Sequence, residues 1–205
     1  MSLAKPSKII GVGRNYVAHA KELGNEVPTE PLIFLKPSSA VIENGQPIRL
    51  PAASARVEYE SEIGIVITRR ISRVSVAEAE KLSYAFTCVN DVTARDLQKK
   101  DSQWARAKGF DTFCPMGPRI VEGLDWRTLE VIGRVNGEER QRGTTSLMVF
   151  PIPLIVSYIS AIMTLEPGDL IATGTPAGTG PLNAGDVVEV EIPGIGILSN
   201  PVVAA

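Results

Sequence analysis

The sequence predicts an α+β domain dominated by a mixed sheet or barrel, and three observations point to this fold class. First, 205 residues are enough to bury one sizeable core, so we expect a single domain over residues 1–205. Second, 18 glycines and 15 prolines suit many tight turns between short strands. Third, strand patterns dominate both the first part and the end of the chain, with a few helical patterns between them.

The bulk composition excludes several classes of protein. Hydrophobic residues make up 44% and charged residues 21%, which is ordinary globular composition. The net charge is -2 and no run of Lys or Arg exceeds two residues, so we expect no binding to nucleic acid or to a membrane surface. The N-terminus lacks the apolar core of a signal peptide, and no stretch approaches the ~20 apolar residues of a membrane span, which predicts a cytoplasmic protein. Cys88 and Cys114 are interpreted as reduced, partly buried thiols.

The elements expected in the first half are mostly short. An alternating pattern over residues 56–68 predicts the longest strand, with Glu58, Glu60 and Glu62 on one face. Ser75 and Glu78 have capping-box spacing and predict a short helix that reaches about Lys81. Thr93 is expected to cap a helix that reaches about Lys99. The remaining segments are strands at 8–12, 32–35 and 84–89, a helical turn at 17–23 and a turn at 44–45.

The second half contains the two best-defined local patterns. Asn136-Gly137 lies between strand patterns and predicts a hairpin with a type I′ turn. Residues 152–163 start with proline and are apolar on most sides, which predicts a buried helix. Strands are expected at 170–173 and 187–192, separated by a glycine-rich loop.

Three carboxylates form a candidate metal site. Glu60 and Glu62 are two residues apart on a predicted strand, so both side chains leave the same face. That face continues as Gly64 and Val66, which indicates a strand that enters the core, and Asp91 ends a second apolar strand. A solvated acidic face is the alternative. Three carboxylates without His or Cys favour a hard cation, with Mg²⁺ preferred and Mn²⁺ or Ca²⁺ as alternatives.

His19 is the only histidine of the chain and a candidate general base. Glu22 follows three residues later, so in a helical turn its carboxylate shares a face with the imidazole and can orient it. Lys108 and Arg95 are either surface cations or counter-charges for a substrate carboxylate. Residues 173–180 lack the ending of a P-loop and are interpreted as a tight loop facing a ligand, or as a plain turn. Gly11 and Gly13 lack the third glycine of a dinucleotide site.

Six segments together resemble the fumarylacetoacetate hydrolase family, and most closely its short acylpyruvate hydrolase and oxaloacetate decarboxylase branch. They occur in order between about Lys8 and Val202, with family-like spacing. The segments are G-V-G-R-N-Y (11–16), F-L-K-P (34–37), Y-E-S-E-I-G (59–64), N-D-V-T-A-R-D (90–96), W-A-R-A-K-G-F (104–110) and T-G-T-P-A-G (173–178). The resemblance implies a β-roll core, a bound Mg²⁺ and a homodimer.

The resemblance also implies roles for individual residues. Glu60, Glu62 and Asp91 look like the family's metal ligands. His19 and Glu22 resemble the pair that activates water, and Lys108 resembles the active-site lysine. The positions at which relatives contact the substrate's carboxylate and oxo oxygens are occupied by Arg95, Gln98 and Thr175. The chain departs from several relatives in one place, because it has Glu58-Tyr59 where they carry histidine before the first metal glutamate.

The expected activity is the cleavage of a carbon–carbon bond beside the keto group of a small 2-oxo acid. Acylpyruvate hydrolysis would use His19 as the base, whereas oxaloacetate decarboxylation needs mainly the metal. Two alternatives remain: an isomerase or decarboxylase of a 2-hydroxydienedioate in aromatic catabolism, and an inactive member of the family that only binds metal. His19 and Lys108 argue against the inactive member, since a pure binder needs no base.

Overall fold

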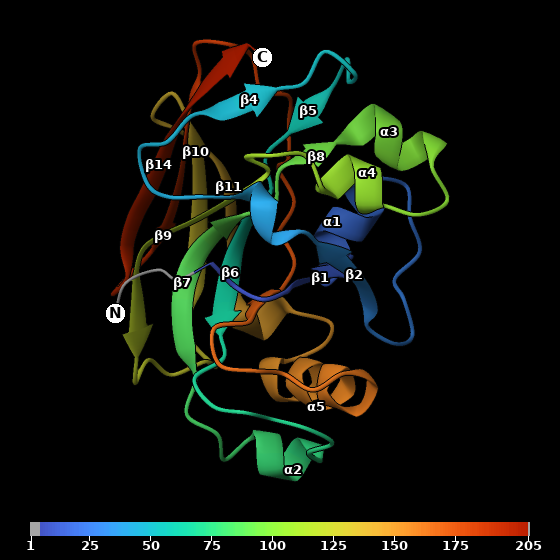
Figure 1. The fold of residues 1–205 in the computed structure, drawn as a ribbon, viewed down its shortest axis with the longest axis vertical. Coiled ribbons are helices and arrows are strands. Elements are labelled where there is room, and N and C mark those ends of the chain that lie inside the picture. Colours follow the sequence, from blue (N-terminus) through green and yellow to red (C-terminus); the bar gives the residue numbers. More distant parts are fainter. Residues whose placement is uncertain (1–4, 205) are drawn as a thin grey trace.

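The structure, a computed structural model, describes residues 5–204. Figure 1 shows curved strands beside a group of three short helices, α1, α3 and α4, with α5 and α2 at another end of the molecule. The helices are α1 (Val17–Glu22), α2 (Val76–Ala79), α3 (Arg95–Lys100), α4 (Ala105–Lys108) and α5 (Ile152–Ile162). Two 3₁₀ turns span Ser38–Ala40 and Thr145–Leu147. The fold class is α+β, as predicted.

The strands form two large sheets and one small one. The seven-stranded sheet has the order β2 (Leu32–Lys36), β1 (Ile9–Gly13), β12 (Leu170–Ala172), β6 (Ser61–Val66), β7 (Ala85–Asn90), β9 (Cys114–Glu122) and β3 (Val41–Ile42). The five-stranded sheet has the order β11 (Glu138–Thr144), β10 (Glu130–Val135), β13 (Val187–Ile192), β14 (Gly196–Ala204) and β4 (Ile48–Leu50). The small sheet pairs β5 (Val57–Glu58) with β8 (Thr93–Ala94). Parallel pairs such as β1 with β12 make the large sheets mixed.

The main core lies between the two large sheets and α5. Ile63, Ile65 and Phe86 of the seven-stranded sheet pack in the same cluster as Val190 and Leu198 of the five-stranded sheet. The other face of β6 is covered too, because Val66 belongs to a second buried cluster. All residues of β6 and β7 are buried, so both strands are closely packed on both faces. They are therefore rigid supports for the residues at their ends. No helix among residues 5–204 is both long and apolar enough to cross a bilayer.

Two local predictions from the sequence are confirmed in detail. Ser75 and Glu78 form both hydrogen bonds of the capping box at the start of α2. Strands β10 and β11 are antiparallel neighbours, and the turn residues Asn136 and Gly137 have φ angles of 54° and 80°, as a type I′ turn requires. These signals are local, so tertiary contacts did not need to be known.

Two other predictions about elements are wrong, and a third is confirmed except at one end of its helix. The strand expected over residues 56–68 breaks after Glu58, because β5 pairs with β8 whereas β6 pairs with β7. Thr93 does not cap a helix: its hydroxyl donates to the carbonyl of Asp91, and α3 begins after Ala94 without a side-chain cap. Helix α5 is buried through Ile152, Ile155, Val156 and Ile159, as predicted, although Ile162 at its end is 56% exposed.

Candidate active site

Three buried carboxylates lie at one end of the neighbouring strands β6 and β7. Glu60 stands in the break between β5 and β6, Glu62 is the second residue of β6, and Asp91 follows β7. The backbone N–H of Asp91 donates to the carbonyl of Glu60, which holds these two residues together. Each carboxylate offers an oxygen atom within 4.8 Å of those of the other two. The predicted metal ligands are therefore brought together, although the strand expected to carry two of them is interrupted.

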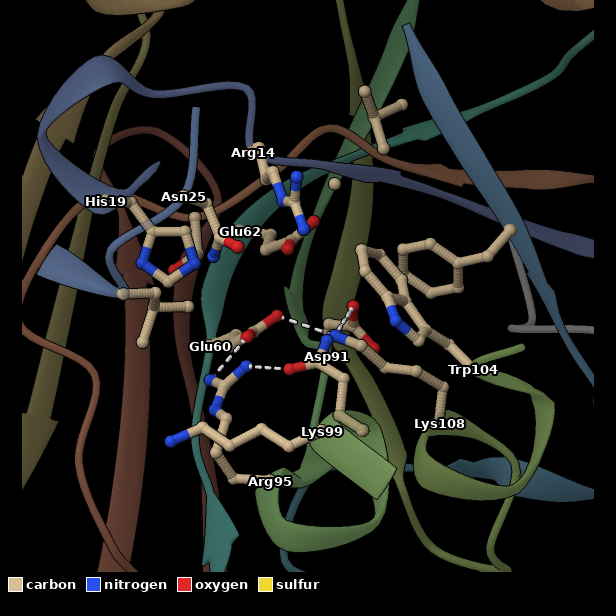
Figure 2. A pocket seen from close by; sticks show the side chains of 16 residues that line it. Arg14, His19, Asn25, Glu60, Glu62, Asp91, Arg95, Lys99, Trp104 and Lys108 are labelled. Atoms are coloured by element: carbon tan, nitrogen blue, oxygen red, sulfur yellow. Dashed lines mark hydrogen bonds and ion pairs between the residues drawn. The ribbon is translucent and has the colours of Figure 1, made fainter. Parts of the chain in front are cut away.

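Three buried cations surround two of these carboxylates. The Nζ atom of Lys108 lies 2.7 Å from Oε2 of Glu60 and 2.6 Å from Oδ2 of Asp91. Lys36 at the end of β2 donates to the other oxygen of Asp91 at 2.5 Å. The guanidinium of Arg95 donates to Glu60 at 2.6 Å and to Glu58 at 2.7 Å. Figure 2 shows Lys108 and Arg95 converging on the acidic cluster from α4 and α3.

The electrostatic environments of the two glutamates are opposite. Burial raises the pKa of Glu60, but Lys108 and Arg95 outweigh burial and hold that pKa below its usual range. Burial raises the pKa of Glu62 well above its usual value, and the negative charges of Asp91 and Glu60 raise it further. Burial lowers the pKa of Lys108, but Asp91 and Glu60 outweigh burial and raise it, so the amine is charged.

This cluster fits a hard divalent cation. Within residues 5–204, Glu62 has no ion-pair partner, and its only hydrogen bond comes from the backbone N–H of Gly174 at 2.8 Å. A buried carboxylate next to two others is costly unless positive charge is supplied. The donors are all carboxylate oxygens, which suit Mg²⁺, Mn²⁺ or Ca²⁺ rather than zinc. Glu60, Glu62 and Asp91 would hold such an ion.

His19 and Glu22 lie beside each other on α1, as the sequence predicts. The imidazole Nδ1 is 3.4 Å from Oε2 of Glu22, and His19 is buried. Glu22 is itself held in place, because its carboxylate accepts the backbone N–H of Gly178 at 3.0 Å. A carboxylate that is fixed in this way orients the imidazole, leaving Nε2 as the nitrogen that can act as base.

The remaining predicted residues, Gln98 and Thr175, both line the cavity. Gln98 accepts a hydrogen bond from Arg95 at 2.7 Å. The hydroxyl of Thr175 donates to the carbonyl of Ser61 and accepts from Gln141, so the protein already uses it. Thr175 lines the cavity, and its contact with a substrate stays a prediction.

A cavity of about 280 Å³ joins these groups. It is lined by every predicted site residue except Glu22, which stands behind His19. The volume is below the usual range for drug-sized ligands and suits a small acid. The wall also contains Phe34 and Trp104, whose rings meet edge to face at 5.4 Å.

Sequence reasoning missed two cationic residues of this site. The ammonium group of Lys36 donates a hydrogen bond to Asp91. The feature of the sequence that could have indicated this role is a lysine inside an otherwise apolar strand, in the segment F-L-K-P. Arg14 lines the cavity and has a positive φ of 57°, and its signal in the sequence is its place in the segment G-V-G-R-N-Y. Cys88 and Cys114 are free, as predicted, and they are fully rather than partly buried, which raises the pKa of each thiol to about 12.

Glu58 and Tyr59, which precede the first predicted metal ligand, hold neighbouring parts of the site in place. Glu58 binds both Arg95 and Arg56, at 2.7 Å and 2.6 Å. The hydroxyl of Tyr59 donates to the carbonyl of Gly178 at 2.9 Å. Glu58 and Tyr59 therefore anchor Arg95 on one side and the glycine-rich loop on the other.

Comparisons with known proteins identify the relatives of this chain. It is 43% identical over 195 residues to an oxaloacetate decarboxylase, mitochondrial, of Dictyostelium discoideum, and the match covers 92% of this chain and 89% of that protein. It is 42% identical over 193 residues to oxaloacetate tautomerase FAHD1, mitochondrial, of Bos taurus, with coverage of 91% and 87%. The crystal structure of a 5-carboxymethyl-2-hydroxymuconate delta-isomerase from Mycobacterium smegmatis superposes with a TM-score of 0.91 at 50% identity, covering 98% of this chain and 80% of that one.

The family model described as fumarylacetoacetate (FAA) hydrolase C-terminal matches residues 8–203. This segment contains all the carboxylates, the cations and the histidine of the site. The chain belongs to the fumarylacetoacetate hydrolase family.

Proposed function

We propose that this protein is a Mg²⁺-dependent enzyme that acts on the bonds beside the oxo group of small 2-oxo acids, with oxaloacetate as its foremost substrate. The observation that carries the proposal is the cluster of Glu60, Glu62 and Asp91 at the wall of a small cavity that also holds a buried histidine. The oxaloacetate-acting relatives support the choice of substrate.

Metal, when bound, supplies positive charge that stabilises the negative charge developing on the oxo oxygen as the neighbouring bond changes. The protein's own cations complete this environment. Lys108 uses two of its three N–H groups on Glu60 and Asp91, which leaves one for an oxygen of the substrate. Arg95 holds Glu60 in place and orients Gln98, which faces the cavity.

In oxaloacetate decarboxylation the bond to the departing carboxylate breaks, its electrons move towards the oxo carbon, and CO₂ leaves without attack by water. A proton then returns to the carbon that lost CO₂. Keto–enol conversion of the same acid moves only protons, from carbon to oxygen or back. The imidazole of His19 lines the cavity and is the side chain that enzymes most often use to take up and release protons, so it is suited to such transfers.

Acylpyruvate hydrolysis is the second candidate, and the arrangement of His19 and Glu22 favours it. Nε2 of His19 takes a proton from water, and the carboxylate of Glu22 supports the charge on the imidazole. The hydroxide formed attacks the distal carbonyl, and cleavage gives pyruvate and a carboxylic acid. An isomerase of a 2-hydroxydienedioate would use the proton transfers alone, and the Mycobacterium smegmatis structure is a relative with a name of that kind.

Product analysis separates these candidates. The purified protein with Mg²⁺ is offered oxaloacetate and, separately, acetylpyruvate, while CO₂, pyruvate, acetate and the enol absorbance are followed. We expect faster CO₂ release or faster keto–enol conversion with oxaloacetate, and pyruvate plus acetate in equal amounts from any acetylpyruvate consumed. If neither acid is changed faster than in buffer with Mg²⁺, the chain is a metal-binding member of the family without this activity.

A further inference from the structure

Arg14 occupies a strained position at the mouth of the site. Its φ of 57° lies in the left-handed region, which is unfavourable for a residue with a Cβ atom. The next residue fixes the backbone there, since the buried Asn15 side chain bonds the carbonyls of Phe150 and Thr173 and the N–H of Phe150. Strain that is held by buried hydrogen bonds is typical of functional positions.

The guanidinium of Arg14 is free to bind a ligand. Within residues 5–204 it forms no hydrogen bond or ion pair, whereas Arg95 and Lys108 are engaged with carboxylates of the protein. Arg14 is half-buried, lines the cavity and lies 6.0 Å from the centre of the Trp104 ring. In Figure 2, Arg14 lies beyond Glu62 and Arg95 beyond Glu60, so the acidic cluster stands between the two arginines.

We infer that Arg14 binds the carboxylate of the substrate that is remote from the oxo group, so that the site selects 2-oxo dicarboxylates over monocarboxylates. The inference rests on the proposed function, because the metal ligands and Lys108 then bind the oxo end of the acid. Lys99 also lines the cavity and forms no ion pair within residues 5–204, but it is exposed, whereas Arg14 is half-buried near Trp104, where a carboxylate without a cation is costly. The planar fork of arginine matches a carboxylate with two parallel hydrogen bonds.

The first test measures binding without turnover, using malate and lactate, two hydroxy acids that differ in the remote carboxylate. Calorimetry is carried out on the Mg²⁺-loaded wild type and on Arg14→Asn, because asparagine tolerates a positive φ. We expect the wild type to bind malate at least about tenfold more tightly than lactate, the usual worth of a charge-assisted hydrogen bond. In Arg14→Asn the ratio should fall to within about threefold through loss of malate affinity alone.

The matched control is Lys21→Asn, which removes the same charge from an exposed position of α1 that does not line the cavity. It should keep the wild-type ratio. An unchanged ratio in Arg14→Asn, or a wild type without preference for malate, would overturn the inference. If Arg14→Asn does not fold, Arg14→Lys decides, since it keeps the charge and loses the fork: the ratio should drop at least about threefold, and an unchanged ratio again overturns it.

The second test separates this inference from the proposed function. The ratio of kcat/KM for oxaloacetate to that for acetylpyruvate should fall at least about tenfold in Arg14→Asn. Turnover of oxaloacetate in the wild type with an unchanged ratio in the variant would remove Arg14 from the site and leave the proposed function standing. A malate preference that depends on Arg14, in a protein that turns over neither acid, would keep the subsite and end the proposed function.

Discussion

The histidine of α1 is the residue whose removal distinguishes the candidate reactions. Attack by water needs a base, whereas loss of CO₂ from a bound oxo acid depends mainly on the positive charge at the oxo oxygen. His19→Ala should therefore lower acetylpyruvate hydrolysis by about two to four orders of magnitude and oxaloacetate decarboxylation much less. Steady-state rates with both acids measure this.

Glu22→Ala is the companion variant, because its carboxylate contacts the imidazole and does not line the cavity. It should shift the two rates in the same direction as His19→Ala but by a smaller factor. If both activities survive His19→Ala unchanged, the pair has a structural role and His19 is not the base of either reaction.

Lys108 joins two of the carboxylates, so its loss should affect both binding and stability. Lys108→Met keeps the length of the side chain but leaves Glu60 without its closest ammonium and Asp91 with Lys36 alone. We expect kcat and substrate affinity to fall together, and the metal-free variant to unfold at a lower temperature. Lys100→Met, at an exposed position of α3, is the control and should change neither. Wild-type kinetic constants in Lys108→Met would remove this lysine from the site.

Individual residues also mark the limit of prediction from the sequence. His19 and Glu22 could be paired because helical spacing alone brings them together. Lys36 could not be assigned a role, because its partner Asp91 is 55 residues away and their contact depends on how β2 and β7 are placed in the sheet. The free guanidinium of Arg14 and its φ are likewise properties of the folded loop.

At the scale of elements, the glycine-rich loop after β12 helps to position the carboxylate of Glu62. Gly174 has a φ of 101°, and its N–H donates to Glu62. A Cβ atom there would lie 2.7 Å from Cβ of Asn15, so Gly174→Ala introduces both strain and a clash. We expect a thermal midpoint at least about 4 °C lower, since about 1 kcal/mol shifts a chain of this size by about 2–4 °C, together with weaker Mg²⁺ binding.

Gly185→Ala is the matched control for that prediction. Gly185 has a similar φ of 98°, but an added Cβ atom would meet nothing within 4 Å, and the residue does not line the cavity. It should lower the thermal midpoint without changing the affinity for Mg²⁺, as measured by calorimetry. Equal loss of Mg²⁺ affinity in both variants would mean that the Gly174 N–H has no specific role.

The sequence could predict the elements that depend on neighbouring residues, and it could not predict those that depend on residues far away in the chain. The hairpin at Asn136-Gly137 and the capping box of α2 depend on residues at most three apart. The break at Tyr59 and Glu60 depends on distant partners, because Tyr59 N–H donates to the carbonyl of Gly180 and Glu60 N–H donates to the Asn90 side chain. No strand was expected over Cys114–Glu122, because Pro115, Gly117 and Pro118 suppress the strand pattern.

At the scale of the whole molecule, the charges of the site are nearly balanced before any ligand binds. Four buried carboxylates, Glu58, Glu60, Glu62 and Asp91, stand against the buried Lys36, Arg95 and Lys108. Glu62 is the carboxylate that these cations leave unpaired. A divalent cation would add positive charge where it is lacking, and an anionic substrate would then restore the balance.

This balance predicts an unusual behaviour for Glu62→Gln. The substitution keeps the shape and an oxygen acceptor for Gly174 but removes a charge that burial and its neighbours disfavour. In chelator the variant should unfold at or above the wild-type temperature. Mg²⁺ at about 100 times its dissociation constant should stabilise the wild type by about 2.7 kcal/mol and the variant by little. An equal response to Mg²⁺ in both proteins would show that the ion binds elsewhere.

We propose that Glu60, Glu62 and Asp91 hold a metal ion that turnover requires, and we assign their carboxylates no other chemical task. The dependence of turnover on metal is therefore the decisive measurement. The protein is treated with excess chelator, assayed with oxaloacetate, and assayed again after Mg²⁺ or Mn²⁺ is restored, with Glu62→Gln in parallel. We expect the wild type to be inactive in chelator and to recover with either ion, and we expect the variant not to recover. Full activity of the wild type in excess chelator would contradict the proposal.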